Sequence, residues 1–216
     1  DIGYQNNKEN ESGIKACYKN IDSYISSLDW AINTPYEGYK KFGFFKDGKY
    51  QQLNSNILQI ENEYYSTIRP KQILQGNEKP VVALRKRGVR YVELRSLDVN
   101  AYDPLGVNDS QLHFLEAFLI FCLFHDSPVI ELPERQEIDN NEMLTAHKGR
   151  QPGLTLSRNG QSQTLSDWAM EIMQEMTAVC TLLDANDPQK PYTASLKKQT
   201  EKVLYPELTP SARMLD

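Results

Sequence analysis

Cysteine is scarce in this sequence of 216 residues, which contains only Cys17, Cys122 and Cys180. None of the three belongs to a CxxC pair, so the sequence carries neither a zinc-ribbon motif nor a dithiol redox motif. Each lies among apolar neighbours at helical spacing. This pattern predicts reduced, buried thiols in a cytoplasmic protein.

Excess positive charge is also missing. Lys and Arg together number 24 against 29 Asp and Glu, which gives a net charge of −5. Binding to nucleic acid of any sequence depends on Lys and Arg side chains that neutralise phosphates. We therefore expect no nucleic-acid partner.

Long hydrophobic runs are absent as well. The longest, Leu112 to Phe124, is interrupted by His113 and Glu116 and is too short to cross the ~30 Å of hydrocarbon in a bilayer. No basic segment followed by an apolar segment opens the chain, so nothing in these residues argues for export. We expect no membrane partner.

The remaining composition is that of a globular protein. Hydrophobic residues make up 39% and charged residues 25%, with 11 Gly and 11 Pro, and a chain of this length can bury a core without a disulfide or a metal. The chain starts at Asp1 without Met and stops in a helix-compatible run, Arg213 to Asp216, that lacks a closing Gly or Asn. We therefore expect a portion of a longer protein.

Apolar residues at three- and four-residue spacing predict helices in several stretches. Asn108 is expected to cap the helix predicted over residues 109–125, with Gln111 in the reciprocal position of a capping box. That helix is apolar on nearly all sides, so we expect it to lie centrally. The predicted helices span residues 14–32, 109–125, 165–183 and 193–204.

Strands are predicted around Phe42–Phe45, before the turn Lys46-Asp47-Gly48, and at Ile57–Ile60, after it. The clearest strand candidate runs from Val89 to Leu97, which is rich in β-branched and aromatic residues. The segments between these helices and strands show no clear periodicity. A polar linker is expected at 69–80, a solvated loop at 85–87, and long loops with one short helix at 127–160. Because helices and strands do not alternate in βαβ units, we predict an α+β fold with an antiparallel sheet.

The predicted strand from Val89 to Leu97 carries a suggestive pair of charges. Alternate side chains of a strand share a face, so Glu93 and Arg95 are expected to be neighbours about 6.6 Å apart. At that spacing the carboxylate can hold Mg²⁺ while the guanidinium binds a phosphate oxygen bridged by the metal. Taken alone, the pattern favours a solvated face, or charges that pair with residues of adjacent strands, because mid-strand charges are common on half-exposed sheets.

A second polar tract runs from Asn54 to Tyr65 and is rich in amides and carboxylates. On a pleated surface such groups can form a binding floor, but they are also typical of an edge strand that uses charge to resist unwanted pairing. Tyr65 and the nearby Arg69 can offer a phenol and a guanidinium to the carboxylate of a small ligand.

Residues Glu61–Lys71 and Arg90–Asn100 resemble tracts of the glutamate–cysteine ligases of the gammaproteobacterial type. The shorter tracts Gly3–Asn6 and Gly149–Leu156 extend the resemblance over essentially the whole chain. Enzymes of that family are much longer. The resemblance therefore implies that residues 1–216 are the C-terminal part of a catalytic domain with a glutamine-synthetase-like fold, whose N-terminal half is absent.

The resemblance also implies a reaction, in which ATP drives the joining of the glutamate γ-carboxylate to the cysteine amine through γ-glutamyl phosphate, the first step of glutathione synthesis. L-glutamate, L-cysteine and ATP would be the substrates and Mg²⁺ a cofactor. Glu93 falls where the family has a magnesium ligand, and Arg95 where an arginine acts on the transferred phosphoryl group. Tyr4 and Tyr65 fall on tyrosines that line the cysteine pocket. Asn62 and Arg69 are assigned to substrate binding because they lie near Tyr65 in the sequence.

One tract departs from the family pattern. Residues 100–104 read Asn-Ala-Tyr-Asp-Pro where the family usually has Asn-Pro-Phe-Ser-Pro, so the loop after the strand is expected to differ in shape. Two other functions also fit the sequence. The chain can be a catalytically silent fragment or regulatory homologue that binds a partner half, or a kinase or another carboxylate–amine ligase, because fold analogy does not identify the amine acceptor.

Overall fold

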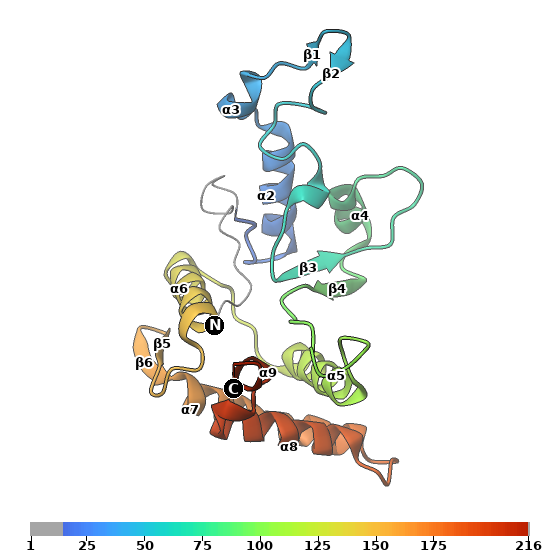
Figure 1. Cartoon of the computed structure of the whole chain (residues 1–216). Helices are drawn as coiled ribbons and strands as arrows, with labels where there is room; N and C mark the ends of the chain where they lie inside the picture. The colour runs from blue at the N-terminus through green and yellow to red at the C-terminus, as the bar shows by residue number, and fades with distance from the viewer. Residues whose placement is uncertain (1–14, 216) are drawn as a thin grey trace. The chain divides into compact units, whose positions relative to one another are not determined.

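The computed structural model describes residues 15–215, which form two compact units (Figure 1). The N-terminal unit comprises residues 15–97 and 129–131, and the C-terminal unit comprises residues 98–128 and 132–215. Tyr4, one of the predicted substrate-binding residues, lies outside the described residues.

In the N-terminal unit, short strands alternate irregularly with helices. Its elements are α2 (Ile21–Asn33), α3 (Glu37–Lys40), β1 (Phe45–Lys46), β2 (Lys49–Tyr50), the 3-10 helix η1 (Glu61–Glu63), β3 (Ile68–Lys71), α4 (Pro80–Arg87) and β4 (Tyr91–Leu94).

Helix α2 confirms the predicted first helix from Ile21 onward. It begins there because the Asn20 side chain accepts a hydrogen bond of 2.8 Å from the Ser23 N–H and so caps the first turn. The predicted apolar stripe is also confirmed, because Ile25, Leu28 and Ile32 are buried.

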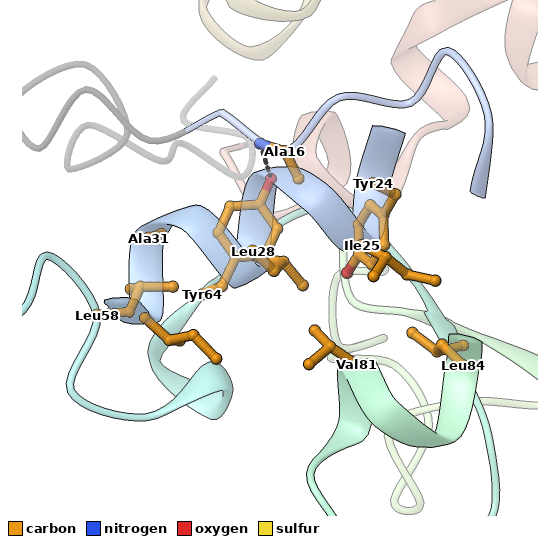
Figure 2. Close-up of a cluster of buried hydrophobic side chains, with 10 residues drawn as sticks. Ala16, Tyr24, Ile25, Leu28, Ala31, Leu58, Tyr64, Val81 and Leu84 are labelled. Carbon is orange, nitrogen blue, oxygen red and sulfur yellow. Dashed lines mark hydrogen bonds between the residues drawn. The ribbon is translucent and has the colours of Figure 1, made fainter. Parts of the chain in front are cut away.

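The core of the N-terminal unit forms where α2 meets α4 and the segment around Tyr64 (Figure 2). Ile25 and Leu28 of α2 are each 2% exposed, as is Val81 of α4. The Tyr64 hydroxyl reaches the backbone N–H of Ala16, which donates to it at 3.1 Å. Tyr64 thus buries its ring without losing the hydrogen bond that its hydroxyl requires.

Strands β3 and β4 form an antiparallel pair in which Arg69 lies opposite Glu93 and Lys71 lies opposite Tyr91. The strand predicted over Val89–Leu97 is therefore confirmed only for its centre. The linker prediction for 69–80 was wrong at its start, where residues 69–71 belong to β3, and is confirmed for residues 72–79, which lie in no helix or strand. A strand needs a partner to form, and the polar Ile68–Lys71 segment becomes a strand only through pairing with β4.

The solvated loop predicted at residues 85–87 is instead the last turn of α4. Pro80 begins this helix, where its missing N–H costs nothing, and Gly88 ends it with φ 70°. Arg85, Lys86 and Arg87 lie at the carboxyl end, where positive side chains interact favourably with the helix dipole.

The amide-rich tract from Asn54 to Tyr65 is not a strand, and both strand interpretations of it were wrong. Its side chains bond to nearby backbone instead. The Asn54 amide donates to the Gln59 carbonyl at 2.8 Å, and the Asn56 amide donates to the Ile32 carbonyl at 2.6 Å. Local bonds of this kind compete with strand pairing, which explains why an amide-rich tract folds as turns.

The C-terminal unit is mostly helical. Its elements are α5 (Asp109–Phe124), α6 (Leu132–Lys148), β5 (Thr155–Arg158), β6 (Gln161–Thr164), α7 (Leu165–Leu183), α8 (Pro191–Leu204), the 3-10 helix η2 (Pro206–Leu208) and α9 (Pro210–Arg213). Helices α5, α7 and α8 enclose a core of Ala117, Met176, Cys180 and Leu196.

The predicted helices of this unit are confirmed, and so is the capping box of α5, in which Asn108 and Gln111 satisfy each other's backbone N–H groups. The central position of α5 is not confirmed. Ala117 is the only one of its residues that is buried, while Leu123 and Phe124 are 79% and 74% exposed. Within the described residues, one side of α5 thus remains uncovered.

The loops predicted for 127–160 were wrong for most of that stretch, because α6 is a helix of 17 residues and β5 begins a hairpin. None of the residues of α6 is buried, so it has no apolar stripe that sequence periodicity could detect. Polar bonds hold it instead. The Asn141 side chain accepts from the Ser157 N–H at 2.9 Å and donates to the Ser157 carbonyl at 2.6 Å.

All strand pairs among residues 15–215 are antiparallel, and the predicted α+β class is confirmed. The cysteine prediction holds for Cys180, which is buried, but was wrong for Cys17 and Cys122, which are exposed. No helix in the described part of the chain is long and apolar enough to span a bilayer.

Candidate functional site

Three charged side chains gather on the β3–β4 pair: Lys71, Glu93 and Arg95. The register explains their meeting. Lys71 lies opposite Tyr91, and Glu93 is two residues further along β4, so both side chains point to the same face. Arg95 continues that face just beyond β4, where its N–H donates to the Thr67 carbonyl at 2.8 Å.

The carboxylate of Glu93 lies between the two cations. Arg95 Nη2 donates to Oε1 at 3.1 Å, and Lys71 Nζ lies 3.2 Å from Oε2. The side chains of Lys71, Glu93 and Arg95 are 20%, 35% and 24% exposed, so all three remain reachable from solvent. The predicted contact between Glu93 and Arg95 is confirmed. The interpretation that charges on an adjacent strand pair with them is confirmed for Glu93, which Lys71 contacts.

Sequence reasoning missed Lys71, although it stands in a tract quoted for the family resemblance. The signal lay in the pairing: once residues 68–71 and 91–94 are recognised as partner strands, Lys71 must share the face of Glu93. We name these three side chains the Lys71–Glu93–Arg95 cluster.

The hydrogen bond from Arg95 holds the pKa of Glu93 below its ordinary value, with a further contribution from Lys71 and an opposing one from desolvation. The carboxylate is therefore ionised at neutral pH, the state that a divalent cation requires of its ligand. A lowered pKa also means that this group stabilises the fold above the carboxyl's ordinary pKa, and that the contribution is lost as the pH falls.

Tyr65 joins the cluster through its ring. The Arg95 Cζ lies 4.9 Å from the ring centroid, within the range of a cation–π contact, and the tyrosine is 43% exposed. The structure thus brings Tyr65 together with Glu93 and Arg95. Its phenol can bind a ligand carboxylate beside the two charged groups.

Asn62 and Arg69 were also predicted to bind substrate, and the strand register places Arg69 directly opposite Glu93. Asn62 is exposed on η1. Arg69 is only 2% exposed, and its Nη2 donates to the Glu61 carbonyl at 3.3 Å. Their assignments to substrate binding stay predictions, and for Arg69 the surroundings are those of a buried structural group.

A buried polar layer surrounds Arg69. Burial raises the pKa of Tyr24 to about 12, although the adjacent Arg69 opposes that shift. Burial also raises the pKa of Glu61, whose Oε2 accepts from the Val81 N–H at 2.8 Å. The Glu61 Oε1 has no hydrogen-bond partner among the described residues, which further favours the protonated form.

A magnesium ion needs several oxygen ligands, and the described residues supply only part of such a set. No group of three or more His, Cys, Asp or Glu in residues 15–215 is placed to hold a metal. The ionised Glu93 fits as one ligand of a site completed by phosphate oxygens or by residues outside the described range. The cluster alone does not make a metal site.

Comparison with known proteins places these residues in a family. The glutamate–cysteine ligase family model matches residues 1–144. The chain is 47% identical over 215 residues to the glutamate–cysteine ligase of Pseudomonas paraeruginosa and 42% identical to that of a Janthinobacterium species. Both alignments cover 100% of this chain and 40% of the relative, so the chain spans less than half the length of the curated relatives it matches.

The fold agrees with the sequence comparison. The crystal structure of the glutamate–cysteine ligase of Francisella tularensis in complex with AMP matches 99% of this chain and 42% of its own, with a TM-score of 0.85 at 34% sequence identity. Sequence and structure together show that this chain belongs to the glutamate–cysteine ligase family.

Proposed function

We propose that the chain supplies part of the phosphate, metal and cysteine site of a cytoplasmic ligase that uses ATP to join the γ-carboxylate of L-glutamate to the amine of L-cysteine, the first step of glutathione synthesis. Residues 1–216 would form the C-terminal part of the catalytic domain, and a partner N-terminal half would complete it. The Lys71–Glu93–Arg95 cluster, in a chain 47% identical to a glutamate–cysteine ligase, carries this proposal.

Nucleotide binding is supported by the kind of cluster present and by the relative from Francisella tularensis, which was crystallised with AMP. Phosphates are bound well by guanidinium and ammonium groups that are already held in place. Arg95 is held between the Glu93 carboxylate and the Tyr65 ring, so little ordering remains to be done when a phosphate binds.

The proposed reaction has two steps. A γ-carboxylate oxygen of glutamate attacks the terminal phosphorus of ATP, the bond to the ADP oxygen breaks, and γ-glutamyl phosphate forms. The cysteine amine then attacks the acyl carbon, phosphate leaves, and the amine loses a proton. In the first step, Arg95 stabilises the charge that develops on the oxygens of the transferred phosphoryl group.

The other residues of the chain bind and orient. Glu93 would hold Mg²⁺, which when bound neutralises charge on the nucleotide phosphates. Tyr65 and Tyr4 would bond the cysteine carboxylate through their phenols. Asn62 and Arg69 are proposed to support the same pocket, Arg69 from beneath the surface.

A reconstitution assay tests this function. The full-length protein that carries this sequence is incubated with Mg²⁺, ATP, glutamate and cysteine, and γ-glutamylcysteine, ADP and phosphate are measured. We expect the three products in equal amounts, and no dipeptide when cysteine is omitted. Equal or faster turnover with another amine would indicate a different carboxylate–amine ligase, and ADP without any dipeptide would contradict the proposal.

Two observations favour a second function: within the described residues the site has a single candidate metal ligand, and α5 leaves Leu123 and Phe124 exposed. The 216-residue chain alone would then be a silent fragment that binds a partner half. Calorimetry with Mg-ATP and cysteine distinguishes a silent fragment from a chain that binds substrates by itself. We expect no heat of binding for the 216-residue chain and a measurable one for the full-length protein.

A further inference from the structure

Lys71 is the one member of the cluster for which neither the family resemblance nor the predicted strand pattern suggested a role. It comes from β3, whereas Glu93 and Arg95 come from β4 and its continuation. Its side chain is 20% exposed, which is low for a lysine, so its ammonium group has lost much of its hydration.

The carboxylate that compensates this loss is shared. Among residues 15–215, Glu93 is the carboxylate that pairs with Lys71, and the same carboxylate accepts a hydrogen bond from Arg95. A partly desolvated ammonium group that shares its counter-ion has capacity for a further anionic partner, because each ammonium offers three donors.

The position of that ammonium group is specific. Lys71 Nζ lies 3.2 Å from Glu93 Oε2, on the side of the carboxylate away from the oxygen that Arg95 contacts. If Glu93 serves as a metal ligand, as the proposed function holds, Lys71 lies beside that ligand and its ammonium group can reach toward an anion bound to the same metal. Lysine acts on phosphates as a point charge, with no need for the fork geometry of arginine.

We propose that Lys71 is a nucleotide-binding residue, whose ammonium group contacts the terminal phosphates of ATP. This inference rests on the proposed function for the identity of the ligand, and goes beyond it by assigning a residue on β3. The alternative is a purely structural lysine that ties β3 to β4 through Glu93.

Comparing the binding of ATP with that of AMP distinguishes a phosphate-binding Lys71 from a structural one. The affinities of the full-length protein for Mg-ATP and for AMP are measured by calorimetry in the absence of glutamate and cysteine, so that no turnover occurs. AMP lacks the terminal phosphates. We expect Lys71→Met to weaken ATP binding about tenfold or more, as for the loss of a hydrogen bond to a charged group, and to leave AMP binding within about twofold.

Matched variants guard against a trivial loss of structure. Lys71→Arg keeps the charge and should bind ATP within about threefold of the unmutated protein. Lys40→Met removes another paired lysine of the same unit, bonded to Glu37 in α3, and should change neither affinity. If Lys71→Met does not fold, Lys71→Gln replaces it, since glutamine retains a polar end without the charge.

Unchanged ATP binding in folded Lys71→Met, or an equal loss for ATP and AMP, would overturn the assignment. So would an equal loss in Lys71→Met and Lys71→Arg. The reconstitution assay distinguishes this failure from that of the proposed function. If the unmutated protein forms γ-glutamylcysteine but its ATP affinity is insensitive to Lys71, only the role of Lys71 is wrong. If the unmutated protein binds neither nucleotide, both are wrong.

Discussion

Two antiparallel pairs of four-residue strands, β3–β4 and β5–β6, each carry an arginine bonded to a glutamate, but they use it differently. In the C-terminal unit, Arg158 Nη1 lies 2.9 Å and 2.8 Å from the two carboxylate oxygens of Glu171, and its Cζ lies 5.0 Å from the Trp168 ring. Gln163 donates to the same carboxylate. This group is one cation and one anion, satisfied by neighbours in its own unit.

In the N-terminal unit, a single carboxylate is instead shared by two cations from different strands. The pKa values do not reveal this difference. Hydrogen bonds from arginine lower the pKa of Glu171 just as they lower that of Glu93. A shifted pKa marks an ion pair, and only the number and position of the partners indicate whether the pair is structural or available for a ligand.

The largest expected effect concerns Arg95. Arg95→Ala in the full-length protein should reduce γ-glutamylcysteine formation by about a thousandfold or more, the scale of arginines that stabilise phosphoryl transfer. The fold should persist, because Arg95 lies at the surface end of its strand and is 24% exposed. Release of ADP and the far-ultraviolet circular dichroism spectrum check both points.

Arg158→Ala is the matched control for that comparison, because it removes an arginine with the same kind of partner from the other strand pair. Its turnover should stay within about twofold of the unmutated protein, as expected when no transition-state contact is lost. Near-normal ADP release by Arg95→Ala, or an equal loss in both variants, would contradict the distinction between the two pairs.

Glu93→Gln addresses the metal. Glutamine keeps the size of the side chain and one oxygen but loses the charge, so the Mg²⁺ concentration for half-maximal velocity should rise about tenfold. Glu171→Gln, which changes the carboxylate bonded to Arg158, should leave the magnesium titration unchanged. The ligand assignment fails if the titration curves of Glu93→Gln and the unmutated protein coincide.

Stability should respond to the two arginines by similar amounts, because each bonds one carboxylate and contacts one aromatic ring. Arg158→Ala should lower the free energy of unfolding by about 1 kcal/mol, because it removes a partly exposed ion pair and a cation–π contact. Urea denaturation of the 216-residue chain measures this cost. A larger loss from Arg95→Ala than from Arg158→Ala would show that the Lys71–Glu93–Arg95 cluster is mainly structural.

The smallest expected effect is a pH dependence of the unfolding free energy that comes from the buried Glu61. Because burial raises the pKa of Glu61, the folded state binds a proton more readily than the unfolded state, and stability falls as the pH rises from the ordinary carboxyl pKa through the folded-state value. Glu61→Gln keeps an acceptor for the Val81 N–H and removes that fall. Its unfolding free energy should match the unmutated chain in acid and exceed it at neutral pH.

The same substitution at Glu63, which is exposed on η1, is the matched control for this measurement. Urea denaturation at several pH values gives the difference between variant and unmutated chain. A difference that does not change with pH would show that Glu61 has the same pKa in the folded and unfolded states, which would contradict the raised pKa.

Prediction from the sequence succeeded where the information was local. The Asn108 cap and the apolar stripes of α2 and α7 depend on residues within a few positions of one another. It failed for α6, which has no buried residue, and for the exposure of α5. For those elements, the deciding contacts come from elsewhere in the chain or lie outside the described residues.

The candidate site divides in the same way. The adjacency of Glu93 and Arg95 follows from the two-residue period of any strand, and the family resemblance follows from the order of residues, so both were available from the sequence alone. The tertiary structure decided that Lys71 joins them and that Arg69 is buried, because strand register and the packing of α2 and α4 depend on segments that are distant in the chain and brought together by pairing and burial.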